Sequence, residues 1–305
     1  VFMAEKGNHI LTHDQTMLPF IADSFCSKQS SILDRLSTSL KAMGCCCASP
    51  CIGELEVASG IEQLLGQRKE DIRKSIEANS EAIGVMTRAF GGTATTAPEG
   101  TTDYMLGPSL REKWDDPRRV AMVEWMAKVD WACCMARNGF ALGMRKSDGK
   151  LGAVVVVLPY NEGIPNDLSS GLEILKALRA TGMPPSKQLG EDYKGMKARA
   201  WAAQGIIENV KKRHCHRPHA HVRNMSVDPD AQGLGFCGKL MRAVNKWADD
   251  SQLNLWLETS GARNVAIYER FGYKTMEQFT LKCKNDPEVH DEEFGMMRLA
   301  RTPTE

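Results

Sequence analysis

The sequence lacks a long hydrophobic run, an excess of charge of either sign and a repeated paired-cysteine motif. No apolar run approaches the roughly 18 residues that a membrane-spanning helix needs. Lysine and arginine number 39 against 38 aspartates and glutamates, so a nucleic-acid or polyanion surface along the whole chain is not expected. These absences predict a soluble body, which we place in the cytoplasm.

Cysteine usage points the same way. Six of the ten cysteines are scattered through apolar or loop settings, as is usual in a reducing compartment. These are Cys26, Cys133, Cys134, Cys215, Cys237 and Cys283. No C-x-x-C pair recurs at zinc spacing. The cysteine pattern therefore predicts no disulfide framework and no zinc finger.

Four histidines, His214, His216, His219 and His221, lie within eight residues and could ligate zinc or nickel. However, His219 and His221 fall on one face of an expected strand, whereas the other two sit in a basic lead-in to it. We therefore expect no metal. His221 is kept as a candidate site residue.

The segment from Met43 to Cys51 contains a cysteine cluster. Met43-Gly44 followed by small residues is similar to an N-myristoylation start, and Cys45, Cys46 and Cys47 are palmitoylation candidates. Because the chain opens on Val1, one hypothesis is that residues 1–42 are read-in and that translation begins at Met43. Lipidation at Gly44 and the cysteines would anchor the protein to a membrane, whereas the alternative is an unmodified loop.

The most informative stretch runs from Val227 to Leu240. It combines the end of a β-branched and apolar strand, a turn with several glycines, and the start of an amphipathic helix. Glycines let the backbone approach a ligand closely, and the N–H groups of the first helical turn then point at that ligand. Together with the helix dipole, this arrangement predicts a phosphate or pyrophosphate site.

Two ligands compete for this turn. Gly233, Gly235 and Gly238 spell G-x-G-x-x-G, and Glu258 follows Gly238 by 20 residues, as in a dinucleotide-binding fold. That fold puts its first glycine directly after the strand, but residues 228–232 intervene here. Only 47 residues follow Glu258, too few for several more βα units. We therefore favour a different phosphate ligand.

A set of six positions, Val227, Pro229, Gln232, Gly233, Gly235 and Cys237, resembles in order and spacing the acetyl-coenzyme A loop of the GCN5-related N-acetyltransferases (GNAT). Cys237 departs from the glycine or alanine usual at the last position. Residues 257–273 resemble the second half of the same fold: a strand end, Asn264 opening a short helix, Tyr268 one turn later, and an aromatic-Gly-aromatic turn. Two motifs in the correct order are more specific than either alone.

The resemblance implies acetyl-coenzyme A as co-substrate and no metal. It implies coenzyme contacts at Met225, Val227, Gln232, Gly233, Leu234, Gly235, Phe236, Cys237, Gly238, Asn264 and Tyr268. Tyr268 would protonate the departing thiolate, and a backbone N–H near residues 225–227 would meet the oxyanion. An acceptor amine must lose a proton before it attacks the thioester. Glu258 is favoured as the base, with His221 as the other candidate; Glu258 could instead only pair with Arg263.

The expected fold is α/β: a mixed central sheet of six to seven strands flanked by helices, with a helical N-terminal extension. Periodicity predicts helices over 80–90, 116–136, 172–181 and 196–211, a hairpin of 140–145 with 151–158, and a last strand at 294–298. Residues 1–70 form the extension, with helices at 32–43 and 61–76. Residues 71–300 form the GNAT domain, with a helical insertion at 161–218.

The acceptor is inferred from the segment at residues 161–218 and from the first helix of the domain. The long insertion would suit a lid over a small amine, and the first helix and a Leu-Pro strand end resemble puromycin acetyltransferase-like small-molecule acetylators. The predicted function is therefore transfer of acetyl to a primary amine of a small molecule. Two alternatives remain: a peptide or protein acceptor, and a non-catalytic protein that binds acyl-coenzyme A.

Overall fold

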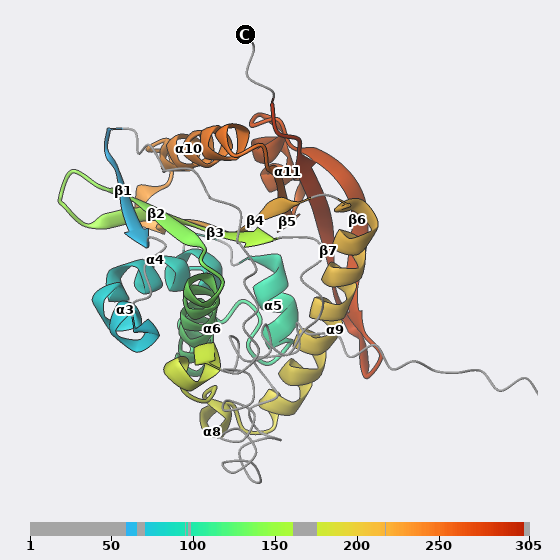
Figure 1. The fold of residues 1–305 in the computed structure, drawn as a ribbon. Coiled ribbons are helices and arrows are strands. Elements are labelled where there is room, and N and C mark those ends of the chain that lie inside the picture. Colours follow the sequence, from blue (N-terminus) through green and yellow to red (C-terminus); the bar gives the residue numbers. More distant parts are fainter. Residues whose placement is uncertain are drawn as a thin grey trace, which may run out of the picture.

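The computed structural model describes residues 59–65, 71–94, 96, 99–160, 176–216 and 218–301. Its centre is a seven-stranded sheet in the order β1-β2-β3-β4-β5-β7-β6 (Figure 1). The strands are β1 (Ile61–Leu65), β2 (Phe140–Arg145), β3 (Leu151–Tyr160), β4 (His219–Val227), β5 (Asn254–Ser260), β6 (Lys274–Cys283) and β7 (Asp286–Arg298). All neighbours pair antiparallel except β4 and β5, which are parallel. The expected mixed α/β sheet is confirmed.

Helices cover both faces of the sheet (Figure 1). In chain order they are α3 (Ile72–Ala78), α4 (Ser80–Gly91), α5 (Gly100–Leu106), α6 (Pro117–Ala136), α8 (Ser186–Leu189), α9 (Asp192–His214), the 3-10 turn η1 (Pro229–Ala231), α10 (Phe236–Asp250) and α11 (Ala262–Glu269). Helices α10 and α11 lie on one side of the sheet, and α3 to α6 lie on the other. We call these the α10 face and the α6 face.

The apolar run of β3 explains how the two layers pack. Val155 and Val157 point into a core with Leu240 and Val244 of α10. The alternate residues of the run, Val154 and Val156, join a second core with α4 and α6. A strand buried on both faces needs such a continuous apolar sequence, because its side chains alternate between the faces.

The helices expected over 80–90 and 116–136 are present as α4 and α6. Asp116 caps α6 by accepting a hydrogen bond from the backbone N–H of Arg118, and proline occupies the first helical position. Helix α9 contains the predicted 196–211 segment and extends it at both ends. Strand β7 is longer than the predicted 294–298, since its first half pairs with β6. That half carries mostly charged residues, so the apolar pattern did not predict it.

The helix expected over 61–76 is wrong. Residues 61–65 form β1, which pairs with β2 at the edge of the sheet and buries Leu65. A separate helix, α3, begins after Asp71, whose carboxylate accepts from the backbone N–H of Lys74. Aspartate favours such a cap over a helix interior, which explains the break at this position.

Several expectations lie outside the described residues. These are the helix over 32–43, the lipidation segment at Gly44 to Cys47, and the first part of the helix over 172–181, of which residues 176–181 are seen as helical. The domain division at residue 70 stays a prediction, although β1 belongs to the sheet. Among the described residues, no helix has the length and apolar character needed to cross a membrane.

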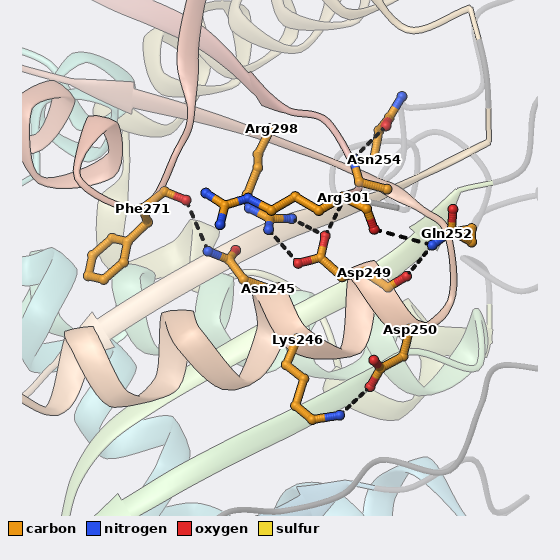
Figure 2. Close-up of polar contacts among 10 residues, drawn as sticks. Asn245, Lys246, Asp249, Asp250, Gln252, Asn254, Phe271, Arg298 and Arg301 are labelled. Atoms are coloured by element: carbon orange, nitrogen blue, oxygen red, sulfur yellow. Dashed lines mark hydrogen bonds and ion pairs between the residues drawn. The ribbon is translucent and has the colours of Figure 1, made fainter. Parts of the chain in front are cut away.

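An ion-pair network fixes the end of α10 to the last strand (Figure 2). The Asp249 carboxylate accepts from both terminal nitrogens of Arg298, at 2.8 and 2.6 Å, and from the backbone N–H of Arg301 at 2.7 Å. Nearby, Asn245 of the same helix donates to the carbonyl of Phe271 at 3.1 Å. These contacts hold α10, and with it the loop that precedes α10, in a fixed position on the sheet.

Candidate active site

The sheet opens at the junction of β4 and β5. These parallel strands pair at only three positions, from His219 opposite Asn254 to His221 opposite Trp256. Beyond them β4 continues to Val227 and β5 to Ser260 without pairing to each other. Ligands of α/β sheets bind at the carboxyl ends of parallel strands, where neighbouring elements diverge. The opening between β4 and β5 is therefore the candidate active site.

The glycine loop lies at the end of β4. After η1, Gly233 and Gly235 adopt φ angles of 83° and 77°, a left-handed conformation that favours glycine. A Cβ at either position would meet no atom within 4 Å, so the space beside the loop is open. Gly235 is the N-cap of α10, and the backbone N–H of Lys239 donates a hydrogen bond to the Gly235 carbonyl.

The first N–H groups of α10 are thus left for a ligand. Residues 236–238 precede the first intrahelical donor, Lys239, and an α-helix leaves such groups without intrahelical partners. With the helix dipole they favour an anion. Gly238 lies within the helix rather than in the turn, so its place in the G-x-G-x-x-G pattern does not reflect a second tight turn.

Two candidate residues from neighbouring strands meet where the pairing of β4 and β5 ends. His221 Nε2 lies 2.7 Å from Glu258 Oε2, and their side chains are only 7% and 10% exposed. The other oxygen of Glu258 accepts from the Trp256 indole N–H at 2.5 Å. Burial alone would raise the pKa of Glu258, but His221, Lys211 and Trp256 together lower the pKa to about 2. Glu258 is therefore ionised and fully engaged.

Tyr268 lies on α11, beside Cys237 at the start of α10. Burial raises the pKa of the Tyr268 phenol, and the neighbouring Cys237 and Glu99 raise it further. Its ring packs edge-on against Tyr273 at a centroid distance of 5.9 Å. Within the described residues no group hydrogen-bonds its hydroxyl, which is thus a protonated donor without an internal acceptor.

The predicted coenzyme residue Asn264 makes a local contact instead. Its side-chain amide donates to the carbonyl of Ser260 at 3.0 Å and so joins the start of α11 to the end of β5. Met225 and Val227 are partly buried against the α10-face core. Leu234, at the tip of the loop, is 54% exposed.

His214 and His219 occupy other positions. His214, at the end of α9, is 2.8 Å from Glu277 of β6 and stacks on Trp256. His219 is buried within β4. Among the residues that the structure describes, no three side chains of metal-binding type converge.

An ion pair at the start of the loop was missed by sequence reasoning. Asp228 accepts two hydrogen bonds from Arg88 of α4, at 3.0 and 2.5 Å, and one from the backbone N–H of Asp230. An aspartate before proline signals the local cap. The partner lies 140 positions away in sequence, and no local pattern identifies it.

Sequence reasoning also missed a group of carboxylates near the end of β5. Glu99 caps α5 through the backbone N–H groups of Thr101 and Thr102, and Ser260 donates to it at 3.4 Å. The hydroxyl of Thr101 donates to Glu293 of β7, which pairs with Ser260 across the sheet. Burial, followed by the charge of Glu99, raises the pKa values of both Glu293 and Asp291.

Comparisons with known proteins agree with this placement. Residues 197–275 match the family model described as acetyltransferase (GNAT) domain. An uncharacterized N-acetyltransferase of Schizosaccharomyces pombe is 30% identical over 100 residues, which are 33% of this chain and 40% of that protein. The chain thus spans less than half the length of this relative.

Two solved structures are similar at low identity. Arylalkylamine N-acetyltransferase 2 from Aedes aegypti is 14% identical, with a TM-score of 0.46 over 73% of this chain and 96% of that one. A histone acetyltransferase and related acetyltransferase from Corynebacterium glutamicum is 15% identical, with a TM-score of 0.44 over 79% and 97%. Similarity at this level leaves the acceptor to be argued from the chain itself. The segment that holds the glycine loop and the His221–Glu258 pair matches a GNAT acetyltransferase domain.

Proposed function

We propose that this protein transfers an acetyl group from acetyl-coenzyme A to a primary amine of a small molecule. The observation that carries the proposal is the contact of His221 with Glu258 where the pairing of β4 and β5 ends, on the strand that leads into the glycine loop. A proton acceptor and an anion site are thus combined in one place. Acyl transfer from a phosphate-bearing coenzyme needs both.

The coenzyme pyrophosphate would bind at the start of α10. Gly233 and Gly235 leave open space beside the loop, and the N–H groups of residues 236–238 supply donors. Gln232 and Leu234, between η1 and α10, and Asn264, near the start of α11, would contact the rest of the coenzyme. The acetyl group would then lie between β4 and β5, with the backbone N–H groups near residues 225–227 available to its carbonyl oxygen.

We assign the base to His221 rather than to Glu258. A carboxylate with a pKa of about 2 accepts a proton poorly near neutral pH, and both oxygens of Glu258 already accept hydrogen bonds. An ionised carboxylate beside an imidazole orients the ring and stabilises its protonated form. Glu258 thus becomes a positioning residue for His221, which reverses the preference drawn from sequence.

The proposed reaction uses His221 as proton acceptor and Tyr268 as proton donor. The acceptor ammonium gives one proton to His221, and the neutral amine attacks the thioester carbonyl. The carbon–sulfur bond breaks, and the thiolate takes a proton from the Tyr268 hydroxyl. The raised pKa of Tyr268 keeps the hydroxyl protonated until that step. As the amide forms, its nitrogen gives its second proton to the Tyr268 phenolate, and His221 releases its proton to solvent. Both groups are thus restored, and one proton is released overall.

The surroundings favour a cationic acceptor. Glu99, Asp291 and Glu293 lie beside Ser260 at the end of β5, on the α6 face that also carries Glu258. The raised pKa of Glu293 keeps that carboxyl neutral near neutral pH, but the charges of Glu99 and Glu258 would attract an ammonium group and repel an anionic acceptor. The resemblance of the first helix to puromycin acetyltransferase-like proteins is consistent with a small acceptor. A peptide amine remains the second candidate.

An amine panel tests the proposal. Purified protein is mixed with acetyl-coenzyme A and, separately, with monoamines, diamines, polyamines, aminoglycosides and short peptides, and release of the coenzyme thiol is followed. We expect thiol release that depends on a small cationic amine. Coenzyme binding without any acceptor-dependent thiol would identify a non-catalytic binder, and release with peptides alone would identify a peptide acetyltransferase.

A further inference from the structure

Strand β4 is interrupted by one extra residue soon after it leaves β5. Opposite β3, Val157 pairs with Val222 and the next residue, Val156, pairs with Asn224, so Arg223 has no partner across the ladder. The last pairing with β5 is at His221, two residues earlier. A β-bulge bends its strand and increases the local twist. The bend therefore lies where β4 turns away from β5.

One carboxylate holds both side chains at this bulge. Arg223 Nε donates to Asp130 Oδ1 at 3.0 Å, and Asn224 Nδ2 donates to Asp130 Oδ2 at 3.0 Å. Asp130 belongs to α6, which packs against the α6 face of the sheet. Asp130 raises the pKa of Arg223 and outweighs the opposing effect of burial. A single residue of α6 thus fixes two consecutive residues of β4.

We propose that Asp130 is a positioning residue for acetyl-coenzyme A. By holding the bulge at Arg223, it keeps β4 bent away from β5 and so keeps the opening wide enough for the thioester. This inference rests on the proposed function, because it takes that opening to be the coenzyme slot. Asp130 acts through β4 and touches neither coenzyme nor acceptor.

The bulge needs such a contact because its extra residue lacks ladder hydrogen bonds. Charge-assisted hydrogen bonds are strong and directional, so they can fix a local backbone shape that strand pairing alone leaves free. The same bend sets the direction of residues 225–227, whose N–H groups were assigned to the acetyl carbonyl. Loss of the contact is therefore expected to weaken coenzyme binding and not only to loosen the fold.

The test is Asp130→Asn, which keeps the shape of the side chain and removes its charge. We expect the dissociation constant for acetyl-coenzyme A, measured by titration calorimetry on the full chain, to rise about 10-fold. The control is Asp192→Asn. Asp192 of α9 also pairs with an arginine, Arg118 of α6, at 3.3 Å, and lies in a different part of the fold. The control should bind the coenzyme like the wild type.

Three outcomes separate the ideas. Wild-type protein that does not bind acetyl-coenzyme A would contradict the proposed function and this inference with it. Wild-type binding matched by Asp130→Asn, with only a lower melting temperature, would overturn the inference alone. If Asp130→Asn fails to fold, Asn224→Ala removes just one of the two hydrogen bonds. A several-fold loss of affinity in that variant supports the inference, and unchanged affinity rejects it.

Discussion

At the scale of single residues, the proposed mechanism uses three side chains from three elements. His221 of β4 and Glu258 of β5 form one contact, and Tyr268 of α11 lies beside the start of α10. Their environments set different protonation states: Glu258 is ionised, while Tyr268 is neutral. Such a separation allows one group to support proton removal and another to supply a proton.

Replacing Tyr268 by phenylalanine should remove the acid. We expect kcat to fall by roughly 10²- to 10⁴-fold, because the thiolate would leave without a positioned proton donor. Coenzyme affinity should change little, since the ring remains. Steady-state kinetics with titration calorimetry would measure both quantities. A Tyr268→Phe variant with the wild-type kcat would show that Tyr268 is not the proton donor.

Replacing Glu258 by glutamine should remove the charge that orients His221. We expect kcat to fall by about 10²-fold or more, with little change in coenzyme affinity. The matched control is Glu62→Gln, because Glu62 of the edge strand β1 also forms an ion pair, with Arg145 at 3.1 Å, away from β4 and β5. An equal fall in kcat in the two variants would show that the substitution acts on the fold rather than on the reaction.

At the scale of elements, the strand, turn and helix that we propose bind the coenzyme were largely predictable. Strand β4, the glycine turn and α10 follow each other in sequence, so a local pattern contains all three. The residues that brace them were not predictable. Arg88 with Asp228, and Asp130 with Arg223, join segments that are 140 and 93 positions apart. A single sequence carries no signal for such pairs.

The glycine turn supplies the prediction at this scale. Gly235→Glu should abolish coenzyme binding, because the new carboxylate would occupy the open space beside the N–H groups of α10 and repel the pyrophosphate. Gly205→Glu is the control. Gly205 lies within α9, also with open space at its Cβ. Coenzyme affinity would be measured by calorimetry. Unchanged affinity in Gly235→Glu would show that the glycine loop does not bind the pyrophosphate.

At the scale of the whole molecule, the sheet joins parts that the sequence suggested were separate. Residues 61–65 were expected in a helix, yet they form the edge strand β1. The same apolar spacing suits a short strand, and only pairing with β2 decides between them. The carboxylates Glu99, Asp291 and Glu293 likewise come together only in the folded chain.

Buried carboxylates make stability depend on pH. The pKa of Glu293 is raised in the folded state, so folded protein binds more protons than unfolded protein between the ordinary and the raised value. Stability from this group is complete below the ordinary pKa and is lost as pH rises. We expect Glu293→Gln to be more stable than wild type at about pH 8, by roughly 1 to 3 kcal/mol, and closer to it at about pH 5.

Urea unfolding at both pH values would measure this difference. The control is Glu288→Gln, an exposed position on the same strand, which should leave the pH dependence unchanged. A wild-type protein whose stability rises steadily over this range, with the same slope in Glu293→Gln, would show that the Glu293 carboxyl is not held in its neutral form.

Acetyl transfer from the coenzyme to an amine can be followed directly with a labelled acetyl group. Acetyl-coenzyme A labelled with carbon-13 in the acetyl group is incubated with the protein and a small cationic amine, and the amine product is identified by mass spectrometry. We expect labelled N-acetylamine from the wild type and far less from His221→Gln. Coenzyme bound to the wild type without labelled product from any amine would contradict the proposed function.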